Sequence, residues 1–100
     1  MSMQMAIPPI PLVVAPETPE AKAAVGFKLA GERVGHRHRI GGDPDWIQLP
    51  QEPKCSCGRE MTFYGQLDSI GDDHILGDCG MVYVFVCFDC LETKSVLQSF

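Results

Sequence analysis

The sequence has no apolar run long enough to cross a membrane. Its longest run, Met81–Phe88, is far short of the ~20 residues that a spanning helix needs. A secretory signal is not expected either, because prolines interrupt the early apolar stretch and the first basic residue is Lys22. We therefore expect a soluble, cytoplasmic protein, in which paired cysteines bind metal more often than they form disulfides.

Basic residues are scarce in the C-terminal part of the chain. Residues 42–100 contain three Lys or Arg and ten Asp or Glu, whereas residues 1–41 contain five Lys or Arg and three Glu. Binding to DNA or RNA depends on basic side chains that neutralise phosphates. We therefore do not expect a nucleic acid as the partner, and the short apolar runs argue against a membrane. The expected partner is a protein or a peptide.

The residue patterns of common active sites are also absent from the sequence. No Ser/His/Asp set and no carboxylate pair stands at a diagnostic spacing, and the acidic stretch Asp68–Gly80 is typical of a solvated loop. We therefore expect a protein that is not an enzyme. The alternative is a thiol redox protein or a small hydrolase that uses the Cys87/Cys90 pair or the histidines His36, His38 and His74.

Cysteine, in contrast, is frequent, and four of the five cysteines form two close pairs. Cys55 and Cys57 are separated by one residue, and Cys87 and Cys90 by two. Zinc binds four thiolates in a tetrahedron with Zn–S distances of roughly 2.3 Å, which two such turns can supply. The sequence therefore predicts one structural Zn²⁺ held by Cys55, Cys57, Cys87 and Cys90, with Cys79 left over.

Two apolar stretches between the cysteine pairs have the length of strands. Met61–Leu67 leaves the first pair, and Met81–Phe88 ends at the second. If these strands are antiparallel neighbours, both pairs lie at the same end of the sheet. Met81–Phe88 is apolar on both faces, which is typical of a central strand covered from both sides. Lys94–Phe100 is expected to be a final edge strand.

The alternation of side chains predicts the faces of the first strand. One face is expected to hold Met61, Phe63, Gly65 and Leu67, and the other Thr62, Tyr64 and Gln66. Trp46 and Ile47 follow a turn at Gly41–Pro44 and are expected to cover a sheet edge. Trp46 and the segment Phe27–Ile40 are also expected to cover one face of the sheet.

The N-terminal part divides into an arm and a short helix. Residues 1–17 form a proline-rich arm, which the prolines exclude from a helix or a central strand, so that it is either flexible or docked. A helix is predicted over Glu17–Gly26, with Thr18 as its N-cap. Phe27–Arg33 is interpreted as a strand, and Val34–Ile40 as a half-exposed strand or loop with solvated arginines.

These elements predict a single domain over residues 18–100 with an α+β fold that is mostly β. A small antiparallel sheet is closed at one end by a zinc-ribbon-like four-cysteine site, and a short helix precedes it. Because the Cys55–Phe100 segment supplies only three strands, bare edges remain. We expect either a homodimer through an edge strand, Lys94–Phe100 or Phe27–Arg33, or docking of the arm across the gap.

Spaced motifs between His38 and Phe100 resemble those of a known family. They are Ile40-Gly41-Gly42-x-Pro44-x-Trp46-Ile47-Gln48, Cys55-x-Cys57-Gly58-x-x-Met61-x-Phe63-x-x-Gln66, Gly77-Asp78-x-Gly80-Met81-x-Tyr83-x-Phe85-x-Cys87-x-x-Cys90 and Leu97-Gln98. In this order they resemble the C-terminal part of the YwqG-like domain family, whose function is not established. The chain lacks most of that family's N-terminal half, and Cys79 stands where a small residue such as Ala is usual.

A looser likeness is to the C-terminal domain of the programmed cell death protein 2 family. There too, a segment of the form C…CG…F…Q is followed by a strand that ends in a C-x-x-C pair. This likeness implies a chaperone-like role, because that family is linked to a newly made ribosomal protein. The first likeness implies an immunity-like role, because some YwqG-like members are similar to immunity proteins of toxin systems.

Overall fold

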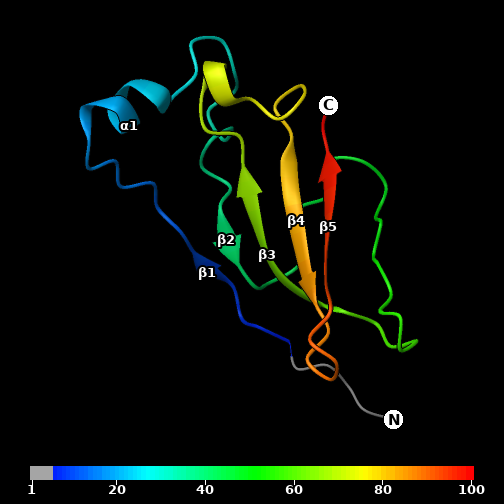
Figure 1. Ribbon diagram of the computed structural model, residues 1–100. Coiled ribbons are helices and arrows are strands. Elements are labelled where there is room, and N and C mark those ends of the chain that lie inside the picture. The colour runs from blue at the N-terminus through cyan, green and yellow to red at the C-terminus, as the bar shows by residue number, and fades with distance from the viewer. Residues whose placement is uncertain (1–5) are drawn as a thin grey trace.

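A five-stranded antiparallel sheet is the framework of the chain (Figure 1). The computed structural model describes residues 6–100. Within them, the strands lie in the sheet in the same order as in the sequence. They are β1 (Ile10–Pro11), β2 (Arg39–Ile40), β3 (Thr62–Asp68), β4 (Met81–Val86) and β5 (Thr93–Gln98), and α1 (Pro19–Ala24) and a 3₁₀ turn, η1 (Asp72–His74), lie between them. This confirms the mostly β fold with one short N-terminal helix.

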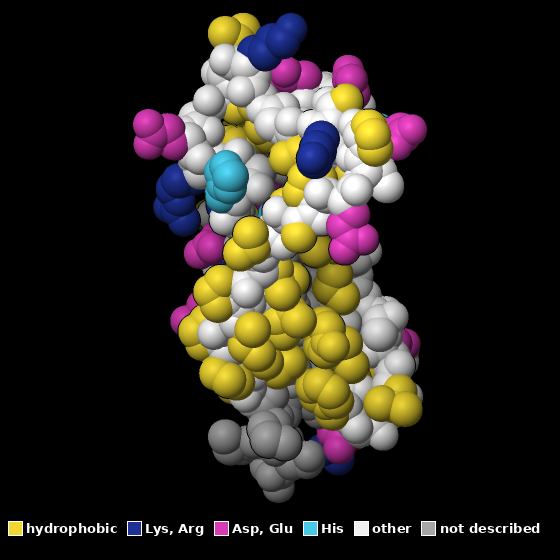
Figure 2. Space-filling view, turned by 90° about the vertical axis from the view of Figure 1, so that its left-hand side faces the viewer, with side chains coloured by type: hydrophobic (Ala, Val, Ile, Leu, Met, Phe, Trp, Pro, Cys, Tyr) yellow, Lys and Arg dark blue, Asp and Glu magenta, His cyan; other side chains and the backbone are white. Residues whose placement is uncertain are grey.

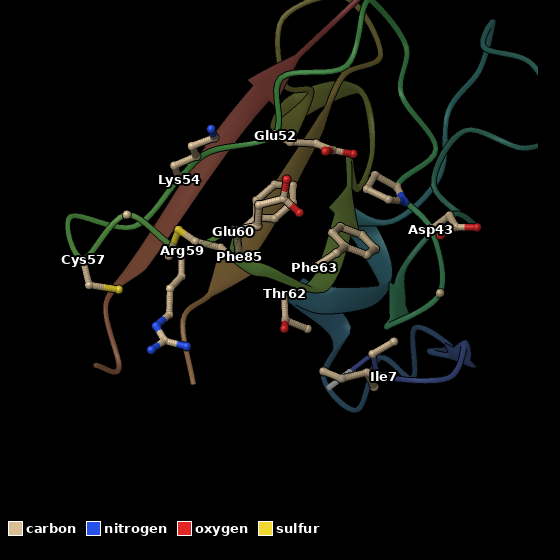
Figure 3. Close-up of a pocket in the computed structure, with 15 residues that line it drawn as sticks. Ile7, Asp43, Glu52, Lys54, Cys57, Arg59, Glu60, Thr62, Phe63 and Phe85 are labelled. Atoms are coloured by element: carbon tan, nitrogen blue, oxygen red, sulfur yellow. The ribbon is translucent and has the colours of Figure 1, made fainter. Parts of the chain in front are cut away.

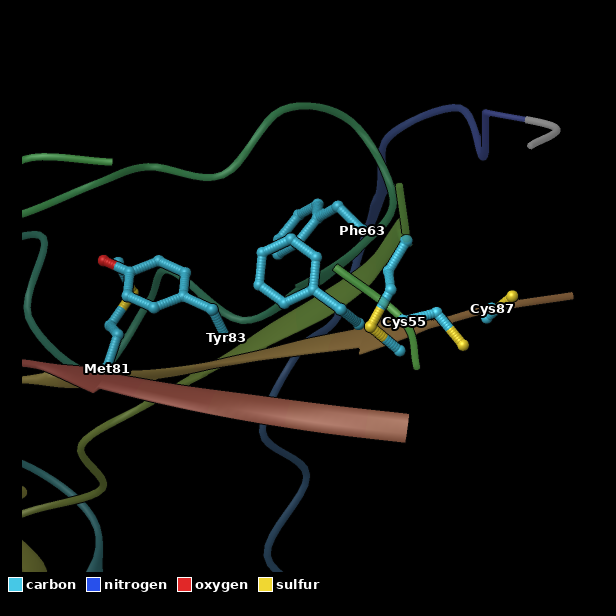
Figure 4. Close-up of a cluster of buried hydrophobic side chains, with 7 residues drawn as sticks. Cys55, Phe63, Met81, Tyr83 and Cys87 are labelled. Atoms are coloured by element: carbon cyan, nitrogen blue, oxygen red, sulfur yellow. The ribbon is translucent and has the colours of Figure 1, made fainter. Parts of the chain in front are cut away.

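The hydrophobic core lies on one face of β4, an inner strand of the sheet. Met81, Tyr83 and Phe85 alternate along β4 with less buried residues and are themselves buried. Figure 4 shows Met81 and Tyr83 pointing to the same face. Trp46 packs over them, with its ring 4.6 Å from that of Tyr83 and 6.0 Å from that of Phe85. Trp46 therefore covers the sheet as expected, and it does so together with Ile47.

The opposite face of the sheet, called the outer face here, is only half covered. Val82 pairs with Leu67 on β3 and with Leu97 on β5, so these three side chains form one row across the sheet. Leu67 is 51% exposed and Leu97 57%. The prediction that β4 is central is thus confirmed, but the prediction that it is covered on both faces is wrong.

A β-bulge at Tyr64 overturns part of the predicted face assignment on β3. Phe63 pairs with Phe85 but Gly65 pairs with Val84, so the register shifts between them. Beyond the shift, Gln66 lies on the core face and is 1% exposed, whereas Leu67 lies on the outer face. The bulge falls where β2 approaches closely, because a Cβ on Gly65 would lie 2.7 Å from the Arg39 carbonyl oxygen.

A buried ion pair joins the segment before β2 to the end of β3. The guanidinium of Arg37 donates to both carboxylate oxygens of Asp68, at 2.8 and 2.7 Å. The side chains are 9% and 0% exposed, respectively. The predictions of a solvated Arg37 and of a loop beginning at Asp68 are therefore wrong, because each residue satisfies the other's charge in the interior.

The helix α1 begins after Thr18, the predicted N-cap, but it ends at Ala24 and is shorter than the predicted range Glu17–Gly26. The Thr18 hydroxyl accepts a hydrogen bond from the Ala21 N–H at 3.0 Å, and Pro19 occupies the first turn. The predicted strand at Phe27–Arg33 is wrong, because these residues form bends and turns. One such turn is closed by the hydrogen bond from the Val34 N–H to the Gly31 carbonyl.

The proline-rich arm contributes the edge strand β1. Ile10 pairs with Ile40 and Pro11 with Arg39, and the Leu12 N–H donates to the His38 carbonyl. The arm is therefore docked along β2 over these residues, and its first five residues lie outside those described. Figure 2 looks onto this side and shows many hydrophobic side chains, and Val13 is the most exposed of those near β1.

We expect Asp68→Asn to destabilise the protein by about 3–5 kcal/mol at neutral pH, because it leaves the Arg37 charge buried without its partner. The exposed Asp73→Asn is the control and should change the melting temperature little. Thermal and urea unfolding measure both. Equal effects of the two substitutions would contradict the structural role of the ion pair.

The contribution of Asp68 should also depend on pH in one direction. Burial alone would raise the pKa of Asp68, but the hydrogen bonds and charge of Arg37 lower it below its ordinary value. A carboxylate with a lowered folded-state pKa stabilises the fold above its unfolded pKa of about 3.9 and loses this effect as the pH falls. The stability difference between the native protein and Asp68→Asn should therefore shrink below about pH 4. A constant difference down to pH 2 would contradict this assignment.

Candidate metal centre

The first cysteine pair lies on a tight turn that precedes β3. The Gly58 N–H donates to the Cys55 carbonyl, and the Cys55 N–H donates to the Arg59 carbonyl, both at 2.9 Å. Gly58 has a φ of +87°, a conformation that side-chain-bearing residues rarely adopt. Lys54 and Glu60 close the turn by a backbone bridge. The one-residue spacing of Cys55 and Cys57 thus fits a turn rather than a strand.

The second pair lies on the turn between β4 and β5. The Cys87 N–H donates to the Glu92 carbonyl at 2.9 Å, and the Leu91 N–H donates to the Cys87 carbonyl at 2.7 Å. Leu91 has a φ of +63°, which reverses the chain directly after Cys90. Each pair is therefore held by backbone hydrogen bonds of its own turn.

The register of β3 and β4 brings the two turns together. Thr62 pairs with Val86, so Cys57 and Cys87 lie beyond the same end of the two strands. The four sulfur atoms all lie within 4.8 Å of one another. In residues 6–100 no other group of three or more Cys, His, Asp or Glu side chains converges in this way. The predicted ligand set is thus brought together as expected, and it is positioned to hold a metal ion.

The sulfur distances can be compared with those of a metal tetrahedron. With Zn–S bonds of roughly 2.3 Å, the edge of a ZnS₄ tetrahedron is about 3.8 Å. The Sγ atoms of Cys57 and Cys87 are 3.8 Å apart, and those of Cys55 and Cys90 are 2.9 Å apart. The edge between Cys57 and Cys87 already has the required length. The edge between Cys55 and Cys90 must open by about 0.9 Å, which a change of the side-chain torsions of the exposed Cys90 can supply.

The backbone around the second pair favours a thiolate. The pKa of Cys87 is lowered to about 7, mainly because the Cys90 N–H donates to its sulfur. For Cys55 the Cys57 N–H acts in the same sense, but the hydrogen bond with Cys90 and burial outweigh it and raise the pKa. A cation at the centre would replace the shared protons, because metal ligation by cysteine requires thiolates and releases protons.

Glu92 links the two turns, a contact for which the sequence pattern carries no signal. Its carboxylate accepts hydrogen bonds from the Ser56 N–H at 2.9 Å and from the Ser56 hydroxyl at 2.6 Å. These bonds lower the pKa of Glu92 to about 2. An ion pair between Arg59 and Asp89, at 3.3 Å, joins the same turns.

Cys79 and the three histidines lie away from this cluster. Cys79 precedes β4 with a φ of +55°, and its carbonyl accepts from Arg37 at 2.9 Å. Nδ1 of His38 accepts from the Asp68 N–H at 3.0 Å, and no residue among 6–100 forms a hydrogen bond with its buried Nε2. His74 is exposed in η1. These residues do not form a common site with the cysteines.

A cavity of about 840 Å³ opens on the core face beside the first cysteine pair (Figure 3). The rings of Phe63 and Phe85 line it, and the carboxylates of Glu52 and Glu60 and the side chain of Lys54 also border it. We call this cavity the groove. A second cavity of about 600 Å³ lies between the arm, α1 and the outer face of β3, and its lining is mostly apolar.

Comparisons with models of protein families, with curated proteins and with solved structures find no match to this chain. The resemblances drawn from the motifs therefore stay predictions. The structure itself defines the class: a small, mostly β domain whose sheet is closed at one end by a four-cysteine cluster that can hold a metal ion. No helix among residues 6–100 is long and apolar enough to span a membrane.

Substitution of a clustered cysteine should unfold the domain. We expect Cys87→Ser to abolish tight metal binding and cooperative unfolding, because ligand loss removes metal-coupled folding energy. Cys79→Ala is the matched control, and it should melt within a few degrees of the native protein because its backbone contacts are kept. Metal content and thermal melting are the measurements. Similar damage from both would show that Cys79 shares the structural role.

Glu92→Gln should weaken metal binding without preventing folding in excess metal. Groups that orient metal ligands typically contribute 10–100-fold to metal affinity. The Glu92 carboxylate accepts one Ser56 hydrogen bond on each oxygen, whereas the amide nitrogen of Gln cannot accept a hydrogen bond. Competition with a chromophoric chelator measures the affinity, and Glu60→Gln, which has an exposed side chain in the first turn, is the control. Equal metal affinities of the two variants would contradict the proposal that Glu92 orients the metal ligands through Ser56.

Proposed function

We propose that the chain is a zinc-stabilised module that binds a protein or a peptide. The observation that carries this proposal is the complete set of four sulfur atoms within 4.8 Å of one another. Four protein ligands fill the tetrahedron of a structural zinc and leave no open position for water or substrate. The metal therefore holds the two turns, and the neighbouring groove supplies the binding surface.

Zinc is the metal that this ligand set favours. Four thiolates in tetrahedral geometry are typical of structural zinc and of iron–sulfur centres, and two turns of this size hold a single ion. We expect native mass spectrometry to show one zinc per chain, which a strong chelator removes together with the fold. A metal-free protein that keeps its native charge-state distribution would contradict the proposal.

The groove has the features of a site for an extended peptide. Its volume, about 840 Å³, falls in the range of small-ligand and peptide clefts. The aromatic rings of Phe63 and Phe85 offer an apolar floor. The border has mixed charge with an excess of carboxylates, because Arg59 is paired with Asp89 and Lys54 shares the border with three acidic residues, Asp43, Glu52 and Glu60. We infer a peptide that carries an apolar side chain next to a basic one, because that pair complements the floor and the border.

The resemblances of the sequence are compatible with such a module. Both the chaperone-like role and the immunity-like role consist of holding another protein rather than of transforming a substrate. We include these roles in the proposal at this level only, as capture of a protein partner in the cytoplasm. The rival function is thiol redox chemistry at the cysteine cluster, which would require these thiols to be free of metal.

Selection from a random peptide library with the zinc-loaded chain tests the binding function. We expect the selected peptides to contain Lys or Arg beside an apolar residue, and to lose affinity about tenfold or more with Glu52→Lys/Glu60→Lys. Glu32→Lys/Asp73→Lys changes the net charge equally at exposed positions outside the groove and is the control.

Two outcomes would contradict the proposal. The first is that no peptide is selected, or that both double variants weaken the binding equally. The second is a purified protein without metal whose cluster thiols all titrate rapidly and reduce disulfide substrates, which would support the redox function. A zinc-loaded chain with Cys79 as its single reactive thiol agrees with the binding module.

A further inference from the structure

The outer edge of β5 has backbone groups that point away from the sheet. In an antiparallel ladder, hydrogen-bonded and non-hydrogen-bonded pairs alternate. The Cys87 N–H donates to the Glu92 carbonyl at 2.9 Å, so the backbone N–H and C=O groups at this position point towards β4. By the same alternation, the backbone groups of Lys94, Val96 and Gln98 also point towards β4. The N–H and C=O groups of Thr93, Ser95 and Leu97 therefore point outward.

Among residues 6–100, no further strand pairs with this edge. The side chains of Thr93, Ser95 and Leu97 are all exposed, and β5 is the last strand of the sheet. Residues 48–54, which come before β3 in the sequence, contact β5 through side chains of the core face. The Gln98 side chain donates to the Leu49 carbonyl and the Lys94 side chain to the Lys54 carbonyl, both at 2.7 Å. In the described chain, no backbone hydrogen bond joins this segment to β5.

The opposite edge of the sheet is closed by proline. The Leu12 N–H donates to the His38 carbonyl at 3.1 Å, and the same alternation makes Leu12 and Ile10 face β2. The outward positions of the arm are then Pro9 and Pro11, which have no N–H. Such an edge cannot donate to another strand, which is a common way to prevent open-ended sheet growth.

We propose that β5 pairs antiparallel with β5 of a second copy of this chain, about a two-fold axis through Ser95. This register places Ser95 opposite Ser95 and Thr93 opposite Leu97, so the outward groups form three hydrogen-bonded pairs. Lys94 lies opposite Val96 of the second copy, and no like charges face each other. The two sheets become one continuous sheet of ten strands, counted from the five of each chain.

The difference between the two edges of the sheet favours a second copy of this chain as the partner of β5. A strand that pairs head to tail, β5 on β1, would meet prolines instead of donors, so the sheet cannot grow into an open array. Pairing of β5 with itself uses both free edges and leaves two proline edges outside, so the assembly closes as a dimer. This inference does not rest on the peptide-binding function, because the groove lies on the core face.

Hydrogen exchange on the zinc-loaded full chain distinguishes the outward amides of β5 from the amides that point towards β4. On dilution from high to low micromolar concentration, the amides of Thr93, Ser95 and Leu97 should lose protection, whereas those of Lys94, Val96 and Gln98 should keep it. Light scattering over the same range should pass from the mass of two chains to that of one. A single-chain mass throughout, with no concentration dependence at these three amides, overturns the proposal.

Substitutions at Ser95 locate the interface. Ser95→Pro removes an outward N–H, which an edge strand tolerates, and it should raise the dimer dissociation constant about tenfold or more, because the two central hydrogen bonds are lost. Ser95→Thr is the control and should dimerise normally. Trp46 fluorescence shows whether each variant is folded.

Ser95→Cys provides a test that does not depend on weakening the dimer. A directly opposed pair in this register has a Cα–Cα distance of about 5.5 Å, which suits a disulfide. Mild oxidation should therefore give a dimer linked through residue 95, identified by peptide mapping. A dimer that Ser95→Pro leaves intact and that Ser95→Cys does not crosslink would have another interface and would refute the proposal.

Discussion

Two of the four clustered cysteines belong both to the hydrophobic core and to the candidate metal site, and the rest of the structure depends on this overlap. Cys55 and Cys87 are buried in the same cluster of side chains as Phe63, Tyr83 and Phe85. The core is small because one face of a narrow sheet supplies nearly all of it, so burial alone stabilises a chain of this size weakly. A metal ion bound between the two turns would fix the end of the core where β3, β4 and β5 meet.

Polar interactions hold the rest of the sheet in place. The bulge at Tyr64 turns Gln66 and Asp68 to the core face, where a purely alternating strand would place apolar side chains. Gln66 donates to the Arg37 carbonyl at 2.8 Å, and Asp68 forms the ion pair with Arg37. These bonds tie the N-terminal third of the chain to the C-terminal strands. The arm then completes the sheet at β2 and blocks that edge with its prolines.

The sequence predicted that the four cysteines Cys55, Cys57, Cys87 and Cys90 come together, and it predicted the helix α1 and the strands β3, β4 and β5. Each of these features has a local signal in spacing, capping or periodicity. The sequence did not predict the bulge, since one extra residue in a ladder leaves no mark on apolar alternation until the partner strand is known. The Arg37–Asp68 pair joins residues far apart in sequence, and charged residues are mostly exposed. The predicted strand at Phe27–Arg33 was wrong: among residues 6–100 no strand pairs with this segment, which forms bends and turns. The identity of the metal and of the partner stays a prediction.

Metal binding and core packing should be coupled, and the indole of Trp46 reports on the packing of the core. Trp46 is the single tryptophan, and it packs against Tyr83 and Phe85 in the core that Cys55 and Cys87 complete. The most direct measurement is a titration of reduced, metal-free protein with Zn²⁺, followed by Trp46 fluorescence and near-ultraviolet circular dichroism. Without metal, we expect the fluorescence and near-ultraviolet spectra of a tryptophan in an unfolded chain. With Zn²⁺, both spectra should become native and should saturate at one equivalent. A native signal in the metal-free protein that Zn²⁺ leaves unchanged would contradict it.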